Sequence, residues 1–299
     1  MSTSTPTTPA AVSQAPLPFS FSLAAGAIAG VTEILTMYPL DVVKTRFQLA
    51  VGAADASILG TFKEIVKSEG PKALYRGILP PILVEAPKRA IKFGCNDMYA
   101  QIYKREFGLK DGKSLAVLTG MSAGVTEAAV VVSFDLVKIR LQDKRNAGKY
   151  KNTTDCVKTI FREEGFRGFF KGLEATVLRH AVWNGGYFGV ISTARSLFPE
   201  PQSKEALLAT NFACGTIGGT VGTMLNTPFD VVKTRVQSQL AAPYKYGWAA
   251  PAIRTIIREE GVAALYKGFG PKVLRLGPGG GILLVVYDFV TTYMRKHFM

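Results

Sequence analysis

The sequence predicts an all-α membrane protein whose six transmembrane helices form three pseudo-threefold repeats, each with a short helix between its two spans. Three observations support this fold class: long stretches almost free of charge, a charged motif that occurs three times, and glycine pairs at constant offsets from that motif. The chain has 299 residues, a net charge of +14 and 47% hydrophobic residues. Such composition alone does not separate membrane proteins from soluble ones.

Three apolar stretches are each long enough to cross a bilayer. Residues 19–40 carry one charge, Glu33; residues 114–134 carry one, Glu127; residues 206–229 carry none. About 20 apolar residues in a helix span the hydrocarbon core. Three further stretches are as long but contain several charges, and by hydropathy alone they fit amphipathic helices of a soluble protein. These are 78–103, 173–198 and 271–289.

A charged motif recurs with a period of about 95 residues, which is typical of a protein built from repeats. Its copies read PLDVVKTRFQ over 39–48, SFDLVKIRLQ over 133–142 and PFDVVKTRVQ over 228–237. Each copy is followed by an acidic residue and glycine, then by an aromatic residue, a basic residue and glycine. These second signals lie at 69–77, 164–172 and 260–268.

Glycine pairs with G-x-x-x-G spacing precede each motif at the same offset, at 26 and 30, 120 and 124, and 215 and 219. This spacing places two glycines on one helix face and favours close packing of helices in lipid. Because each repeat has to return the chain to its starting side, the charged stretches are interpreted as membrane spans as well. Short helices are expected over 57–67, 154–162 and 250–258.

The repeats define the domain organisation. We expect a disordered N-terminal tail over 1–18, which is uncharged and rich in Ser, Thr, Pro and Ala. Repeat 1 follows over 19–112, repeat 2 over 113–202 and repeat 3 over 203–299. The N-terminus shows neither a basic region before the first apolar span nor an Arg-rich amphipathic segment, so any targeting signal is expected to be internal.

Other classes of protein fit poorly. Cys95, Cys156 and Cys214 have no C-x-x-C spacing, so neither a disulfide framework nor a metal site is expected. The pI of about 9.7 suits a nucleic-acid-binding protein, but that interpretation leaves the long uncharged stretches unexplained. Since the sequence shows no nucleophile triad, metal cluster or phosphate loop, we expect no enzyme and no cofactor.

The three motif copies resemble those of the mitochondrial carrier family, P-x-[DE]-x-x-[KR]-x-[KR] followed by [DE]-G-x-x-x-x-aromatic-[KR]-G. The resemblance covers 19–297, with Ser133 in place of one proline. It implies a multi-pass transporter of the mitochondrial inner membrane that works as a monomer by alternating access. The loops inside each repeat are rich in Lys and Arg, with ten such residues over 138–171. The positive-inside rule then places them, with the short matrix helices, on the matrix side.

Within this family, three stretches are similar to those of carriers for 2-oxodicarboxylates: PKRAIKF over 87–93, the Arg179-His180 pair, and RLGPGGGI over 275–282. The resemblance implies exchange of 2-oxoadipate and 2-oxoglutarate. The alternative cargo is another carboxylate, such as citrate or a simple dicarboxylate.

A matrix gate is implied by the resemblance, because each motif aspartate would reach the motif lysine of another repeat. The implied pairs are Asp41 with Lys138, Asp135 with Lys233, and Asp230 with Lys44. Alternatively, each aspartate pairs with the lysine three residues later on its own helix, as in an ordinary surface ion pair. One turn beyond the lysines, a glutamine in each copy is expected to brace the gate by hydrogen bonding: Gln48, Gln142 and Gln237.

The family's cytosolic gate motif, aromatic-[DE]-x-x-[KR], is incomplete in this sequence. Only Asp97 and Arg195 look like a retained pair, and Tyr287-Asp288 lacks its expected basic partner. The sequence therefore predicts a weaker lock on the cytosolic side.

Candidate substrate-binding residues are the cations in the charged spans. A cation at mid-membrane depth is energetically costly, so its presence there indicates a function. Arg179 and Arg275 are expected to clamp two carboxylates, since arginine binds carboxylates through two hydrogen bonds. The alternative for both arginines is that they extend to the interface. The further candidates are Lys88, Lys92, His180, Trp183 and Asn184. For His180 and Trp183 a structural role is an equal alternative.

Two acidic residues and three glycines complete the candidates. Glu33 and Glu127 occupy equivalent positions in repeats 1 and 2, and either neutralise a cavity lysine, bind a proton that accompanies the substrate, or form a hydrogen bond between two helices. A glycine ends the second signal of each repeat, and exposed N–H groups there suit a phosphate. The resemblance implies cardiolipin at these glycines, Gly77, Gly172 and Gly268.

Overall fold

The computed structural model describes residues 18–50, 57–110, 112–146, 148–199, 203–240 and 244–298, and these form helices joined by turns. The expected tail lies, up to residue 17, outside the described residues. Six helices are long: α1 (Phe19–Leu49), α3 (Leu79–Phe107), α4 (Lys113–Gln142), α6 (Leu173–Leu197), α7 (Lys204–Ser238) and α9 (Phe269–Phe298). Three are short: α2 (Ile58–Glu69), α5 (Thr153–Gly168) and α8 (Ala249–Glu260). The 3₁₀ turns are η1 (Pro71–Tyr75), η2 (Lys144–Asn146) and η3 (Val262–Tyr266).

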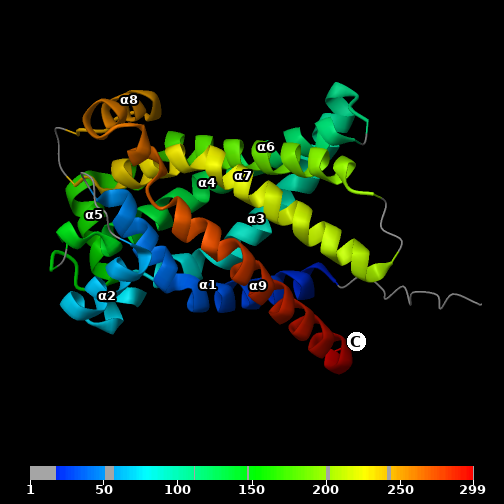
Figure 1. Cartoon of the computed structure of the whole chain (residues 1–299), viewed down its shortest axis with the longest axis horizontal. Coiled ribbons are helices and arrows are strands. Elements are labelled where there is room, and N and C mark those ends of the chain that lie inside the picture. Colours follow the sequence, from blue (N-terminus) through cyan, green and yellow to red (C-terminus); the bar gives the residue numbers. More distant parts are fainter. Residues whose placement is uncertain are drawn as a thin grey trace, which may run out of the picture.

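The long helices form a closed ring in chain order. Within the repeats, α1 packs on α3, α4 on α6 and α7 on α9; between them, α3 packs on α4, α6 on α7 and α9 on α1. Figure 1 shows α2, α5 and α8 gathered at one end of this bundle, which we call the short-helix end. The fold class predicted from the repeats is confirmed, since each repeat contributes two long helices and one short helix.

Three of the described helices are apolar enough to cross a membrane, over Ser20–Leu49, Ser114–Gln142 and Val262–His297. The third begins in η3 and covers most of α9, which contains one of the segments whose hydropathy alone had suggested a soluble amphipathic helix. The apolar stretch 206–229 lies within α7, several of whose side chains are outside the described part. The helices α1, α4 and α7 also extend past their apolar stretches, so the charged motifs occupy their last turns.

Three equivalent hydrophobic clusters fix the short-helix end. In repeat 1, Val42 and Val43 of α1 pack with Ile65 of α2 and Leu74 of η1. In repeat 2, α4 packs on α5 through Leu136, Cys156 and Ile160. In repeat 3, α7 packs on α8 and η3 through Val231, Ile256 and Leu265. Burying each such side chain stabilises the fold by about 1.5–3 kcal/mol, which holds the short helices against the ends of α1, α4 and α7.

Where the structure describes their surroundings, glycines of the G-x-x-x-G pairs face side chains of neighbouring helices, as Gly219 does with Leu276 of α9. A Cβ on Gly30 would meet Glu85 Oε1 and one on Gly26 would meet Arg89, so these glycines make room for α3 side chains. A Cβ on Gly215 would meet nothing within 4 Å. Spacing predicts which residues share a face, but not whether a backbone or a side chain fills the space in front of it.

Candidate functional site

A cavity of about 600 Å³ lies between the long helices, lined by residues of α1, α4, α6, α7 and α9. Cations and acids face it together. Its charged and polar lining comprises Glu33, Asp41, Lys44, Glu127, Arg179, His180, Trp183, Thr223, Asn226, Lys272 and Arg275. The cavity extends from the level of the charged motifs to about two turns beyond them, away from the short-helix end.

A ring of ion pairs between motif residues lies beside this cavity. Each motif lysine reaches the aspartate of a different repeat, so the three pairs join α1, α4 and α7 in a cycle. The pairs are Lys44 Nζ with Asp230 Oδ2 at 2.6 Å, Lys138 Nζ with Asp41 Oδ2 at 2.9 Å, and Lys233 with Asp135. We call this set the ion-pair ring. Because each pair spans two repeats, the helices cannot separate there without stranding charges.

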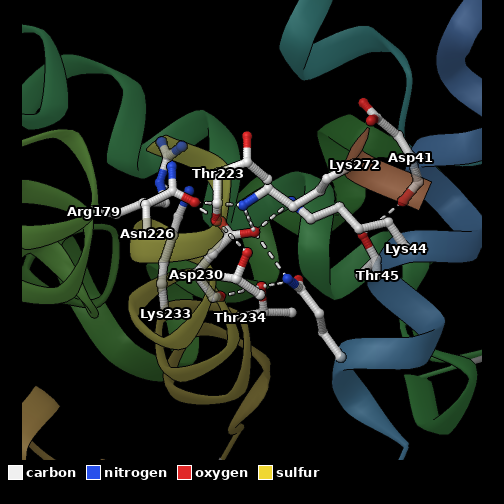
Figure 2. A network of polar contacts seen from close by, with 12 residues as sticks. Asp41, Lys44, Thr45, Arg179, Thr223, Asn226, Asp230, Lys233, Thr234 and Lys272 are labelled. Carbon is white, nitrogen blue, oxygen red and sulfur yellow. Dashed lines mark hydrogen bonds and ion pairs between the residues drawn. The ribbon is translucent and has the colours of Figure 1, made fainter. Parts of the chain in front are cut away.

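Asp230 has the most donors in the ion-pair ring, and it is only 3% exposed. Besides Lys44, Gln48 Nε2 donates to its Oδ2 at 2.8 Å. Lys272 Nζ lies 3.4 Å from the same oxygen, and Figure 2 shows Lys44 and Lys272 converging on Asp230. Lys272 Nζ also donates to Asn226 Oδ1 at 2.7 Å. This cluster ties α9 to α7 at the cavity floor.

Arg275 of α9 bridges two carboxylates of α1. Its Nη1 donates to Asp41 Oδ1 at 2.5 Å, while Nη2 and Nε donate to Glu33 Oε1 at 2.6 and 3.1 Å. Arg275 therefore touches both the cavity wall and the ion-pair ring.

Arg179 of α6 is less tightly held. Its Nε lies 3.6 Å from Asp230 Oδ1 and its Nη2 lies 4.0 Å from Asp135 Oδ2. Nη2 donates to His180 Nε2 at 2.7 Å, since a guanidinium has no acceptor. Among the described residues, the buried Nε has no hydrogen-bond partner. Such a buried donor beside the cavity can donate to an oxygen of a bound anion at little further desolvation cost.

A second set of ion pairs joins each long helix to its short helix. Arg235 of α7 pairs with Glu260, which also accepts from Lys267 Nζ at 3.1 Å. In the same arrangement, Arg140 pairs with Glu164 and Arg46 Nη2 donates to Glu69 at 2.8 Å. Burial raises the pKa of Glu260, but the hydrogen bonds from Arg235 and Lys267 outweigh it and lower the pKa to about 2.

Comparison with known sequences shows which protein family has this architecture. The model of the family described as mitochondrial carrier protein matches residues 15–107, 113–202 and 204–298. A protein of Dictyostelium discoideum named probable mitochondrial 2-oxodicarboxylate carrier is 58% identical over 284 residues, covering 95% of this chain and 93% of the relative.

A Schizosaccharomyces pombe protein of the same name is 54% identical, with 94% of this chain and 96% of the relative covered. An Aspergillus niger protein named mitochondrial citrate transporter D is 54% identical, with 95% and 97% covered.

The chain belongs to the mitochondrial carrier family. It is therefore a multi-pass transporter of the mitochondrial inner membrane.

The carrier's cavity contains part of the predicted substrate site. Arg179, His180, Trp183 and Arg275 line it. The side chains of Lys92 and Asn184 lie outside the described part of the structure.

Lys88 differs from expectation, because it does not line the described cavity. Its Nζ lies 2.5 Å from Glu85 Oε2, and Arg89 Nε lies 2.8 Å from Glu85 Oε1. Glu85 is only 2% exposed. A buried carboxylate is costly unless it is paired, so Glu85 holds the cations three and four residues later on its own helix.

The motif residues of the carrier show the cyclic pairing that the family resemblance implied, rather than pairs within one helix. The glutamines differ from one another. Gln48 bonds directly to Asp230, as expected. Gln142 Nε2 donates instead to the hydroxyl of Tyr38, whose ring lies 5.3 Å from Lys138 Nζ. The expectation is wrong for Gln237, which donates to the backbone oxygens of Val132 and Lys171.

At the opposite end, the predicted cytosolic gate is sparse. Asp97 is exposed, and among the described side chains neither Asp97 nor Asp288 forms an ion pair. Tyr287 is partly buried, and the Arg195 side chain is outside the described part.

The two predicted acids of the carrier both line the cavity, and Glu33 pairs with an arginine rather than a lysine. The third repeat has Gly222 at this position. A Cβ on Gly186 of α6 would lie 3.3 Å from Gly222 Cα, so α6 and α7 approach each other closely beside this position.

The three glycines predicted to bind lipid all lie at joints between repeats. Their φ angles are positive, at 78°, 74° and 84° for Gly77, Gly172 and Gly268. A Cβ on Gly77 would lie 3.2 Å from Lys138 O, and one on Gly268 would lie 3.2 Å from Lys44 O. Both the backbone conformation and the space exclude a side chain.

Sequence reasoning missed three residues: Lys272 and Asn226, which line the cavity, and Tyr38, which lies beside Lys138 of the ion-pair ring. Lys272 had a signal, because it is a single charge in an otherwise uncharged first turn of α9. Tyr38 and Asn226 precede their motifs by one and two residues, but polar residues beside a charged motif are too common to have marked them.

Proposed function

We propose that this carrier exchanges 2-oxodicarboxylates, such as 2-oxoadipate and 2-oxoglutarate, across the inner membrane through the central cavity. The observation that carries the proposal is that Arg179 and Arg275, from different repeats, face one cavity. Two guanidinium groups on facing helices suit an anion with a carboxylate at each end. The names of relatives at 58% and 54% identity support the 2-oxo acid class.

His180 and Lys272 would orient the substrate between the two arginines. The His180 ring lies beside the Arg179 guanidinium, close enough to interact with a polar group next to a bound carboxylate. The Nζ of Lys272 adds a cation at the cavity floor. The partly unpaired donors of Arg179 favour it as the first contact of an entering anion.

The ion-pair ring would act as the matrix gate. The positive-inside rule favours a matrix location for the short-helix end, where the loops inside the repeats gather. Opening the ring strands buried charges, at about 3–5 kcal/mol for each broken pair. A bound dicarboxylate lowers this cost if it binds the open state more tightly than the closed state. The conformational change is then faster with substrate bound than without it.

Lipid and monomeric state are further parts of the proposal. Gly172 directly precedes α6, and helix N-termini favour phosphate. We propose cardiolipin at the three repeat joints and a monomer as the working unit. Delipidated carrier should gain thermal stability from added cardiolipin and not from phosphatidylcholine; equal stabilisation by both would contradict lipid selectivity.

The experiment is exchange in liposomes loaded with 2-oxoglutarate. Labelled 2-oxoadipate and 2-oxoglutarate should enter in a manner that depends on internal substrate, faster than succinate, citrate or ATP. The panel includes citrate because of the name of the Aspergillus niger relative. Arg275→Ala should reduce uptake to background, whereas Lys149→Ala, which removes a surface pair with Glu163, should not. Faster exchange of citrate than of either 2-oxo acid would overturn the substrate class.

A further inference from the structure

Arg275 is held by Glu33 in the way an arginine holds a substrate. Oε1 of Glu33 accepts from both Nε and Nη2, at 3.1 and 2.6 Å. Nε and Nη2 form an edge of the guanidinium that can bind a carboxylate through two parallel N–H groups. A substrate carboxylate and Glu33 therefore need the same donors on Arg275.

The fold leaves space beside Gly279 for the Glu33 carboxylate. A Cβ on Gly279, one turn after Arg275 on α9, would lie 3.1 Å from Glu33 Oε1 and 3.6 Å from Arg275 Cγ. The missing side chain at Gly279 thus leaves space for the carboxylate and for the stem of the arginine. Glu33 is also largely buried, with its side chain 19% exposed.

We propose that Glu33 is an internal competitor of the substrate, which sets both the carrier's affinity and the charge of the cargo that it accepts. This inference rests on the proposed function, since it requires that Arg275 binds a substrate carboxylate. On entry, the substrate carboxylate replaces Glu33 on the Nε and Nη2 edge of Arg275. Glu33 remains in the cavity as a negative charge and opposes cargo with a third carboxylate.

Displacement of Glu33 takes place beside the ion-pair ring. Nη1 of Arg275 donates to Asp41, the partner of Lys138 in the ring. A substrate that pulls the guanidinium from α1 weakens the second cation contact of Asp41. The competitor and the ring are therefore linked through one side chain.

Glu127 provides a matched control. It occupies the equivalent position in repeat 2 and also lines the cavity, so Glu127→Gln raises the cavity charge by the same amount as Glu33→Gln. The three donor atoms of Arg275 described here bond to Glu33 and Asp41. An effect of cavity charge alone would thus be the same in the two variants, whereas competition for Arg275 affects only one.

The test is the KM for 2-oxoglutarate, and for citrate, in exchange by reconstituted wild type, Glu33→Gln, Glu33→Asp and Glu127→Gln. Glu33→Gln should lower the KM for 2-oxoglutarate by about tenfold, because a charged acceptor leaves Arg275. Glu33→Asp, which keeps the charge but shortens the reach, should also lower it. The preference for citrate relative to 2-oxoglutarate should rise in Glu33→Gln and not in Glu33→Asp.

The outcomes separate this inference from the function on which it rests. If wild type exchanges no dicarboxylate, the proposed function fails. If wild type exchanges 2-oxoglutarate but Glu33→Gln changes its KM by less than about twofold, or Glu127→Gln lowers it equally, the competitor role is wrong. If Glu33→Gln does not fold, an unchanged KM in Glu33→Asp overturns the role by itself.

Discussion

Arg235 in repeat 3 and Gln48 in repeat 1 meet across the joint of α7 and α1, where Arg235 Nε donates to the Gln48 carbonyl oxygen over 3.0 Å. Arg140 makes the equivalent contact between repeats 2 and 3, with its Nε 3.3 Å from Gln237 O. The third joint differs, because the buried Nε of Arg46 has no hydrogen-bond partner within the described part of the chain. The pseudo-threefold carrier therefore has two arginine-clamped joints and one unclamped joint.

This asymmetry predicts unequal losses of stability. Arg140→Ala should lower the free energy of unfolding by about 3–5 kcal/mol, because the buried Glu164 is left with Lys171 alone and two carbonyl oxygens lose a charged donor. Arg46→Ala should lower it by about 2 kcal/mol, since only the contact with Glu69 is lost. Thermal unfolding in detergent measures both. The surface variant Lys149→Ala should shift the transition little, and equal shifts for Arg46→Ala and Arg140→Ala would show that the clamps add nothing.

Removing one partner of an ion pair in the ring should abolish exchange, and the accompanying loss of stability should depend on how many cation contacts are removed. Asp41→Ala leaves Lys138 without its carboxylate and Arg275 with Glu33 alone, whereas Lys138→Ala leaves Asp41 paired with Arg275. Both variants should lose exchange, and Asp41→Ala should also lose about 3–5 kcal/mol of stability. Exchange rates in liposomes and thermal unfolding are measured together. Wild-type exchange in both variants would end the assignment of the ion-pair ring as a gate.

The lowered pKa of Glu260 predicts acid sensitivity at the short-helix end. A carboxyl whose pKa falls from the usual 4.5 to about 2 on folding stabilises the protein fully above that usual value. This contribution is lost as the pH falls from about 5 towards 2, because the unfolded chain binds the proton first. Glu260→Gln should therefore be less stable than wild type at pH 7, and the difference should shrink on acidification. A difference independent of pH would contradict the pairing with Arg235 and Lys267.

Cys156 should be unreactive in the folded carrier. It is fully buried in the cluster between α4 and α5, and burial raises the pKa of its thiol to about 12. Because the thiolate is the nucleophile, a maleimide should label it only after unfolding. A variant that carries Cys95→Ser and Cys214→Ser leaves this thiol alone for measurement. Labelling at pH 7 well below the unfolding temperature would show that α5 opens locally.

The repeat explains how much could be predicted. A period of about 95 residues and the motif copies identify six spans, three short helices and the family, since chance seldom repeats several spacings three times. The pairing of each motif lysine with the aspartate of another repeat followed from the family resemblance. Because the three repeats are related by pseudo-threefold symmetry, one such lysine–aspartate pair predicts the other two.

Prediction failed where the repeats differ in their surroundings. Gln48, Gln142 and Gln237 occupy equivalent positions yet bond to a carboxylate, a tyrosine hydroxyl and backbone oxygens. Lys88 was expected in the cavity, but the buried Glu85 of its own helix holds it. Symmetry sets the backbone position of each side chain, but the surrounding residues determine what that side chain contacts.

By itself, the sequence determined the repeats, the spans and which residues carry charge into the membrane, because helical length and periodicity are local properties. Only the tertiary structure decided that Arg275 spans from Glu33 to Asp41, and that one repeat joint lacks its arginine clamp. Those partners lie more than 200 residues apart in the chain, so their contact depends on how whole helices pack and not on any local pattern.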